Sequence, residues 1–255
     1  MKVILDADVL IYQSLPRDPF SAFPLAIENY MRIKQNILEA SFGTSIASCV
    51  SLDGVNFRKN EYPSYKFKRK QKDPPEHLFD LKNWVLENDP DIIGSVAGEG
   101  DDIVLELAAD ELEAGRPFVV ASVDKDIKTL GPMTYYNMRN RQHERISINQ
   151  AYDFIMQQFI QGDSGDDIPG IRGMGPAKTL KYLDPYKTPE EKWNAVKEIW
   201  KEKEPSSWQE GFNDTANLSF IRRRAEDLRT LEFTDMSFSD FKSLLRFDLS
   251  GYEVV

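Results

Sequence analysis

Acidic side chains follow four short apolar runs in the first half of this sequence. The acids are Asp6, Asp53, Glu99 with neighbouring Asp101 and Asp102, and Asp124 with neighbouring Asp126. Helical patterns separate the runs, which predicts parallel strands joined by crossover helices. Because the carboxyl ends of parallel strands lie along one edge of a sheet, we expect these carboxylates to converge on one crevice.

Carboxylates gathered in this way predict a site for divalent cations. Like charges at close range stay ionised only when cations neutralise them. Oxygen ligands favour Mg²⁺, Mn²⁺ or Ca²⁺ over Zn²⁺, and the chain has no cluster of His and Cys residues. Two such ions, about 3.5–4 Å apart, can hold the attacking and leaving oxygens of a phosphoryl transfer. The sequence therefore indicates metal-dependent phosphodiester chemistry.

Each acid also has a local structural alternative. Asp6 and Asp124 could cap helices after their strands, and Asp8 fits a capping role better than a ligand role. Asp53 could belong to a simple turn, and the acids from Glu99 to Asp102 could occupy a first helical turn. The recurrence of acids at all four strand ends favours the metal interpretation.

The elements that must position these acids form an α/β fold with a mostly parallel central sheet and flanking helices. The predicted strands are 3–5, 45–52, 92–97 and 118–123; the predicted helices are 25–38, 76–87, 101–114, 150–160, 190–201 and 215–231. Helical patterns dominate after about Ile148. We therefore expect an α/β core over residues 1–148, including a basic segment at about 58–75, and a helical region over 149–255.

The net charge of −10 argues against nucleic-acid binding, but the distribution of charge overrides the total. Seven bases lie between Arg58 and Lys72, opposed only by Glu61. Tyr62, Tyr65 and Phe67 are interleaved with them. Aromatic rings can stack on bases while the cations follow phosphates, so this segment is typical of a strand-binding region.

A glycine-rich stretch at 162–178 is the most specific pattern in the chain. Gly170, Gly173 and Gly175 precede a helix that is expected to open at Pro176, and such a turn presents backbone N–H groups to phosphates. Asp163 and Asp166, three residues apart, could add ligands for a second metal. A plain loop between helices is the alternative.

Together these motifs resemble the 5′-nuclease family of flap endonucleases and 5′→3′ exonucleases, in particular its short phage and bacterial members. The resemblance covers Met1 to about Leu183. Its motifs are Ile4-Leu5-Asp6, Leu52-Asp53-Gly54 with Asn56-Phe57-Arg58, Tyr65 to Arg69, Glu99 to Asp102, Asp124-Lys125-Asp126 and the Gly162 to Gly175 turn.

The resemblance implies a PIN-like core, a helical arch, and a helix-hairpin-helix-like (H3TH) DNA-binding region. It implies one metal held by Asp6, Asp53, Glu99 and Asp101 with Asp102 near both ions, and a second held by Asp124, Asp126, Asp163 and Asp166. It assigns Lys66 and Arg69 to catalysis in the arch, and Arg58, Lys66, Lys68, Arg69, Gly170, Gly173, Gly175 and Lys178 to DNA binding. The implied cofactors are two Mg²⁺ ions, replaceable by Mn²⁺, and K⁺ at the turn.

Two positions depart from the family pattern. Gly100 stands where alanine is frequent, and Asp167 stands where asparagine is frequent. After Leu183 the resemblance fades, and two interpretations of Arg222, Arg223, Arg224 and Arg229 stay open: DNA contacts, or a solvated helix face, which we favour.

The expected function is hydrolysis of DNA near free 5′ ends, flaps and nicks, extending to RNA primers in RNA–DNA hybrids, during replication or repair. Replication proteins are further expected partners, the expected compartment is the cytoplasm of a bacterium, phage-infected or not, and no membrane association is expected. Two alternatives remain: a PIN-type metal-dependent ribonuclease, and a non-catalytic, structure-specific DNA-binding accessory.

Overall fold

The computed structural model describes residues 1–18, 20, 22–54, 56–68, 73–95 and 97–253. The chain divides into two compact units, which are described separately below. The first unit comprises residues 1–56, 72–127 and 133–145; the second comprises residues 57–71, 128–132 and 146–255. Within the described residues, no helix is both long enough and apolar enough to cross a lipid bilayer.

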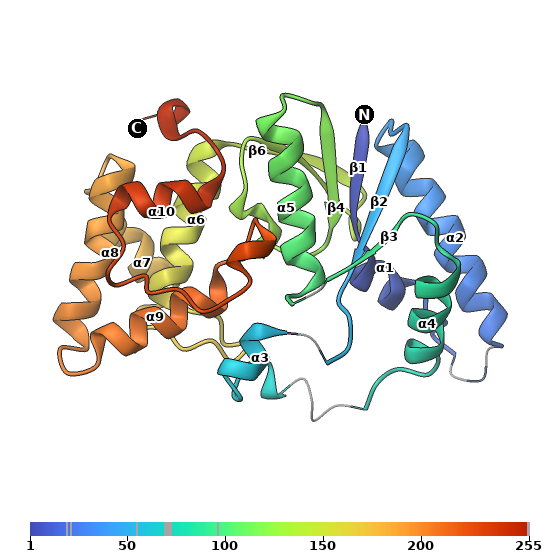
Figure 1. Cartoon of the computed structure of the whole chain (residues 1–255), viewed down its shortest axis with the longest axis horizontal. Helices are drawn as coiled ribbons and strands as arrows, with labels where there is room; N and C mark the ends of the chain where they lie inside the picture. Colours follow the sequence, from blue (N-terminus) through green and yellow to red (C-terminus); the bar gives the residue numbers. More distant parts are fainter. Residues whose placement is uncertain (19, 21, 55, 69–72, 96, 254–255) are drawn as a thin grey trace. The chain divides into compact units, whose positions relative to one another are not determined.

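The first unit is built on a six-stranded sheet (Figure 1). Its strands are β1 (Lys2–Asp6), β2 (Ser45–Val50), β3 (Ile92–Gly94), β4 (Phe118–Ser122), β5 (Met133–Asn137) and β6 (Gln142–Ile146). The strand order is β3-β2-β1-β4-β5-β6, and the pairs β2–β3, β1–β2, β1–β4 and β4–β5 are parallel. The predicted α/β class with a mostly parallel sheet is confirmed.

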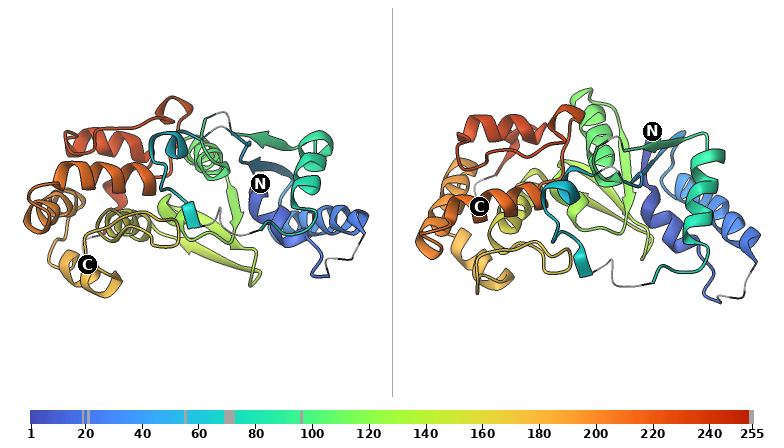
Figure 2. Two further views of the ribbon diagram at one scale, coloured as in Figure 1. Left: turned by 90° about the horizontal axis from the view of Figure 1, so that it is seen from below. Right: turned by 60° about the horizontal axis from the view of Figure 1, so that its bottom comes forward.

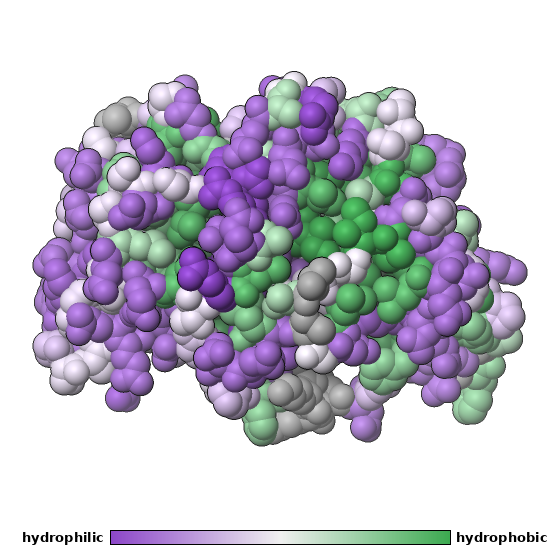
Figure 3. Space-filling view, viewed as in Figure 1, coloured by the Kyte–Doolittle hydropathy of each residue, from purple (hydrophilic) through white to green (hydrophobic). Residues whose placement is uncertain are grey.

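The helices of the first unit cover both faces of this sheet. They are α1 (Ala7–Ser14), α2 (Phe23–Ala40), α4 (Leu78–Asn88) and α5 (Gly100–Glu113). Val3 and Leu5 of β1 share a hydrophobic core with residues of α1, α2 and α4. Ile4 alternates to the opposite face, where α5 packs against β1, β2 and β4, in front of the strands in Figure 1. In the view of Figure 3, apolar residues gather over this unit between α5 and α4.

The strands β5 and β6 are absent from the sequence prediction. They lie at one edge of the sheet, in yellow-green in Figure 2. The burial pattern of β6 is exposed at four of its five positions, because an edge strand contributes little to the core. Such a strand lacks the apolar signal on which the prediction depends.

The second unit is helical apart from its turns. Its helices are α3 (Phe57–Glu61), α6 (Ile148–Gln161), α7 (Pro176–Leu183), α8 (Pro189–Lys203), α9 (Trp208–Ser219) and α10 (Phe238–Leu245), with 3₁₀ turns at Ala225–Asp227 and Leu249–Gly251. An aromatic core joins α6, α8, α9 and α10. Phe159 meets Trp193 and Phe212 edge to face, while Trp193 stacks on Phe241 with ring centroids 4.2 Å apart.

Residues 58–68 of the basic segment belong to the second unit, although the segment was predicted as part of the α/β core. Tyr65 is buried against Ile168 and Leu218, and the Lys66 N–H donates to the Asp166 carbonyl at 2.9 Å. These contacts with the turn after α6 and with α9 are what place the described part of the segment in this unit.

Candidate metal centre and nucleic-acid interface

Asp6 lies at the carboxyl end of β1 and is 4% exposed. One carboxylate oxygen accepts a hydrogen bond from the Val9 N–H at 3.1 Å, so Asp6 caps α1. The other accepts from the Ser122 hydroxyl at 2.6 Å, at the end of the neighbouring strand β4. Burial raises the pKa of Asp6 to about 7, the hydrogen bond from Ser122 opposes this shift, and the charges of Asp8 and Asp124 add to it. Asp6 is thus a helix cap and also a member of a group of like charges.

Asp8 was predicted to be a cap, and that prediction is wrong, because Asp6 occupies the cap position. The Asp8 carboxylate turns instead toward the end of β2, where it accepts from the N–H of Ser51 at 2.8 Å and from its hydroxyl at 2.6 Å. Burial raises the pKa of Asp8, and the charge of Glu99 raises it further. Sequence reasoning missed this residue; the signal was a second acid two positions after a strand-ending Asp.

The acids before and within the first turn of α5 are held by the helix start itself. Glu99 is the cap residue of α5 and is 8% exposed, while Asp102 is 3% exposed. The Glu99 N–H donates to the Asp102 carboxylate at 2.9 Å. Burial raises the pKa of the Cys49 thiol in β2, and the nearby charge of Asp101 raises it further. The start of α5 therefore lies beside the end of β2, as the parallel order requires.

The acids after β4 form a tight turn. The Asp124 carboxylate accepts from the Asp126 N–H at 2.8 Å, and the Asp124 N–H donates to the Ser122 hydroxyl at 3.0 Å. Tyr135 of β5 donates its hydroxyl to the Asp124 carbonyl at 3.1 Å. Asp124 thus follows its strand as predicted, and its charge is one of those that raise the pKa of Asp6.

Asp53 forms none of these hydrogen bonds, although the charge of its partner Lys82 lowers the pKa of Asp8, against the larger effect of burial. Its side chain is 76% exposed and forms an ion pair with Lys82 of α4 at 2.7 Å. Among the described residues, no group of three or more His, Cys, Asp or Glu side chains is arranged to hold a metal ion. The first unit does bring four acids close enough for their charges to interact: Asp8 and Asp124 act on Asp6, and Glu99 acts on Asp8. A bound cation would relieve this repulsion.

The glycine-rich turn of the second unit follows α6 and leads into α7, which opens at Pro176 as predicted. A side chain at Gly170 would lie 2.2 Å from the Gln161 backbone, so this glycine permits close approach of two chain segments. Gly173 has a positive φ of 80°. Open space surrounds the Cα of Gly173 and of Gly175. Gly173 and Gly175 thus leave the backbone unobstructed, whereas Gly170 serves the packing of the turn.

Asp163 and Asp166 lie in the same turn. Asp163 accepts from the Gly165 N–H through its carboxylate at 2.7 Å, and its backbone pairs with Ile168 in an antiparallel bridge. The Asp166 carboxylate lies 3.7 Å from the Lys66 ammonium, and both side chains are largely buried. The structure therefore brings an acid assigned to the second metal against a base assigned to catalysis.

The described part of the basic segment uses several of its charges internally. Arg58 is 2% exposed, donates to the Phe220 carbonyl at 3.0 Å and lies over the Phe57 ring. Lys68 forms an ion pair with Asp167 at 2.6 Å. The prediction that Arg58 contacts DNA and that Tyr65 stacks on bases is corrected, because both are buried by packing within this unit. Arg69 lies outside the described residues, and Lys178 of α7 is exposed.

Of the four arginines after α9, Arg222 and Arg223 are neither a solvated face nor free for DNA, whereas Arg229 is exposed and Arg224 is half-buried. The predicted helix over 215–231 is wrong beyond Ser219, where α9 ends. Arg222 is fully buried and donates to the Asn217 side chain at 2.7 Å and to the Phe220 carbonyl at 2.9 Å. Arg223 is 1% exposed and donates to the carbonyls of Leu245 and Thr129. Both guanidinium groups therefore bind carbonyl oxygens inside the second unit.

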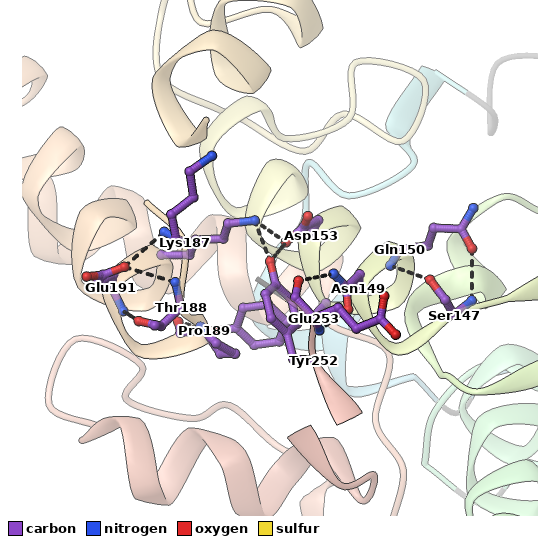
Figure 4. Close-up of polar contacts among 12 residues, drawn as sticks. Ser147, Asn149, Gln150, Asp153, Lys187, Thr188, Pro189, Glu191, Tyr252 and Glu253 are labelled. Carbon is purple, nitrogen blue, oxygen red and sulfur yellow. Dashed lines mark hydrogen bonds and ion pairs between the residues drawn. The ribbon is translucent and has the colours of Figure 1, made fainter. Parts of the chain in front are cut away.

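A cavity of about 220 Å³ lies in the second unit between α6, α7, α8 and the C-terminal residues. In Figure 4 Asp153 and Tyr252 meet there, with the Tyr252 hydroxyl donating to the Asp153 carboxylate at 2.6 Å and Lys192 donating to both. Asn149 ties down the backbone of Glu253 on the same side. None of the described residues that line this cavity belongs to the predicted site.

The fold of the chain is that of the 5′-nucleases. It is similar to the T5 5′-exonuclease with bound divalent metal ions (zinc), with a TM-score of 0.62 at 16% identity, covering 99% of this chain and 100% of that one. It is also similar to the catalytic core of Rad2 in complex with DNA substrate, with a TM-score of 0.52 at 14% identity, covering 98% and 89%. At these identities the likeness shows the fold.

Sequence relatives point the same way. The flap endonuclease Xni of Shewanella sp. strain W3-18-1 is 30% identical over 155 residues, which are 53% of this chain and 55% of that protein. The Xni of Shewanella sp. strain MR-4 is 28% identical over 169 residues, covering 60% and 62%. The matched stretch thus spans little more than half the length of these relatives, and no family model matches the chain. The resemblance to 5′-nucleases drawn from the motifs is confirmed by both comparisons.

Proposed function

We propose that this chain is a divalent-metal-dependent 5′-nuclease that hydrolyses DNA phosphodiesters near free 5′ ends, flaps and nicks. The observation that carries the proposal is the environment of Asp6, whose carboxylate is buried beside the charges of Asp8 and Asp124. Like charges at neighbouring strand ends repel one another around the buried Asp6, and a bound cation would compensate this repulsion. The similarity to flap endonucleases over the matched stretch supports the same function.

The donor set fits hard cations. The acids offer only carboxylate oxygens, which suit Mg²⁺ or Mn²⁺, and the one nearby thiol, Cys49, is fully buried with a raised pKa. Asp6, Glu99 and Asp101 would hold the first ion with Asp102 near both ions, and Asp53 would have to leave Lys82 to join them. The resemblance assigns a second ion to Asp124, Asp126, Asp163 and Asp166. When bound, such ions supply an activated hydroxide and neutralise charge on the phosphate.

The second unit would bind the nucleic acid. Lys66 is held over the Tyr65 ring at 4.8 Å and beside Asp166, which fixes its ammonium for a contact with the scissile phosphate. Gly173 and Gly175 leave backbone N–H groups accessible to a phosphate diester, with Lys178 exposed on the following helix. K⁺ at this turn, RNA–DNA hybrids as substrates and contacts with replication proteins are extensions of the same proposal.

The test is digestion of 5′-labelled flap, nicked and blunt DNA, and of single-stranded RNA, with and without Mg²⁺. We expect Mg²⁺-dependent cleavage of the DNA substrates near the 5′ end. Cleavage of RNA alone would support the PIN-type ribonuclease instead. Tight binding of flap DNA without any cleavage would support a non-catalytic accessory.

A further inference from the structure

Among the acids whose charges act on one another at the strand ends, Asp8 is the one to which the family resemblance assigns no role. It lies in the first turn of α1, directly after the strand-ending Asp6 and Ala7. A single carboxylate oxygen, Oδ2, accepts two hydrogen bonds from Ser51, one from the N–H at 2.8 Å and one from the hydroxyl at 2.6 Å. Asp8 thereby fixes the first residue after β2.

Ser51 continues the connection to α5. Its hydroxyl oxygen accepts from the Gly100 N–H at 2.8 Å. Gly100 is the first residue of α5, so this N–H is one of the amides that no carbonyl within the helix can satisfy. The resulting chain of amide, hydroxyl and carboxylate joins the starts of α5 and α1 through the end of β2. Gly100 is flanked by Glu99 and Asp101, two of the acids proposed as metal ligands.

The same contact explains why residue 100 is glycine here. A Cβ at this position would lie 2.8 Å from Asp8 Oδ2, 3.2 Å from the Ser51 nitrogen and 3.3 Å from the Cys49 carbonyl. The methyl group of an alanine here would collide with the Asp8 carboxylate, which its two hydrogen bonds to Ser51 hold in place. Asp8 and Gly100 are therefore a matched pair, in which the acid occupies the space that a methyl group would need.

We propose that Asp8 is a positioning residue of the acidic centre: through Ser51 it anchors Gly100, and with it Glu99 and Asp101, beside Asp6. This inference rests on the proposed function. The physical reason for an anchor is that carboxylates brought close together repel one another, so the start of α5 needs a tether to stay at the edge of the sheet.

The first test compares four variants in the binding of Mn²⁺ to the metal-free protein, measured by calorimetry. Asp8→Ala and Ser51→Ala each break the connection, and we expect affinity to fall about tenfold, as for the loss of one or two buried hydrogen bonds. Asp8→Asn keeps a carbonyl oxygen able to accept both bonds from Ser51, and we expect affinity within about threefold of wild type. Arg32→Ala, at an exposed position of α2 away from the predicted site, serves as the control and leaves affinity unchanged.

An equal loss in Asp8→Asn and Asp8→Ala would show that Asp8 acts through its charge, as a ligand, and would overturn the positioning role. Thermal unfolding of the metal-free variants supplies a second readout. A lower melting temperature in Asp8→Ala with unchanged Mn²⁺ affinity would show a merely structural contact, and would also overturn the inference.

The second test uses the steric pair. Gly100→Ala alone should weaken Mn²⁺ binding, because the new methyl group displaces Asp8. In the Asp8→Ala/Gly100→Ala double variant the collision with Asp8 is gone and only the contacts with the Ser51 nitrogen and the Cys49 carbonyl remain, so the loss of affinity should be smaller than the sum of the two single losses. Additive losses would contradict the pairing. A wild-type protein that binds no Mn²⁺ would sink the proposed function itself, whereas binding that is indifferent to all these substitutions would sink only the role of Asp8.

Discussion

In the first unit, burial and the charges of Asp8 and Asp124 raise the pKa of Asp6, and burial and the charge of Glu99 raise that of Asp8. In the second unit, Asp166 and Asp167 each face a lysine of the basic segment. The first arrangement is electrostatically unfavourable until a proton or a cation is taken up. The second is already neutral and can exchange a carboxylate partner for a phosphate. The comparison fits the proposed roles, in which the acids of the first unit would bind divalent metal ions and the lysines of the second unit would contact phosphates.

The largest effect is expected from removing one charge of the acidic group. We expect Asp124→Asn to lower Mg²⁺-dependent cleavage by a factor on the order of 1000, since the loss of a ligand forfeits several kcal/mol of charge stabilisation. Flap-DNA binding should stay close to wild type. Single-turnover kinetics measure the cleavage, and a titration measures the DNA binding. Cleavage by Asp124→Asn at the wild-type rate would show that the acidic group of the first unit does not bind the catalytic metal.

The second prediction concerns pH. Burial raises the pKa of Asp6 from 3.8 to about 7. Between these two pH values the Asp6 carboxyl keeps its proton in the folded metal-free protein and loses it in the unfolded chain. The folded state then binds more protons, so this group's contribution to stability falls as the pH rises from about 4 to about 7. Denaturant unfolding of wild type and Asp6→Asn at several pH values isolates the contribution.

We expect wild type to lose stability relative to Asp6→Asn as the pH rises across that window, and Mg²⁺ binding at pH 6 to release protons. Calorimetry in two buffers of different ionisation enthalpy detects the release. A difference between the two proteins that is independent of pH would show that Asp6 is ionised without a metal.

The third prediction separates catalysis from binding in the second unit. Lys66→Ala should lower kcat by about 10- to 100-fold with little change in KM, because a prepositioned ammonium stabilises charge in the transition state. Lys178→Ala, at an exposed position, is the matched control. It should weaken DNA binding and reduce the slope of log affinity against log salt concentration by about one, leaving kcat unchanged. An effect of Lys66→Ala confined to KM would mean that Lys66 only holds the strand.

The smallest effect is expected at Asp167. Its carboxylate accepts from the Lys68 N–H at 2.9 Å and pairs with the Lys68 ammonium, which lowers the pKa of Asp167. Asp167→Asn keeps an acceptor for the N–H and tolerates the positive φ of 57°, but removes the charge. We expect faster hydrogen exchange at the amides of Lys66 and Lys68 and slightly tighter DNA binding at low salt. Unchanged exchange would show that the ion pair does not hold the segment.

The sequence by itself determined the strand ends and the acids that follow them. Apolar runs locate β1, β2 and β4, and the parallel order predicted from the intervening helices places Asp6 and Asp124 at one edge of a sheet. The glycine spacing likewise predicted the start of α7 at Pro176. These features depend on local patterns, which short stretches of chain encode completely.

Only the tertiary structure decided which charges are buried and what they bind. Arg58 and Arg222 both donate to the Phe220 carbonyl, although Arg58 is 162 residues away from it in the chain and Arg222 only 2. Arg58 was predicted to contact DNA and Arg222 to lie on a solvated face, yet both lie inside the second unit. Asp8 finds its partner 43 residues away in Ser51. Such bonds depend on acceptors supplied by distant segments, and no local pattern of residue types records them.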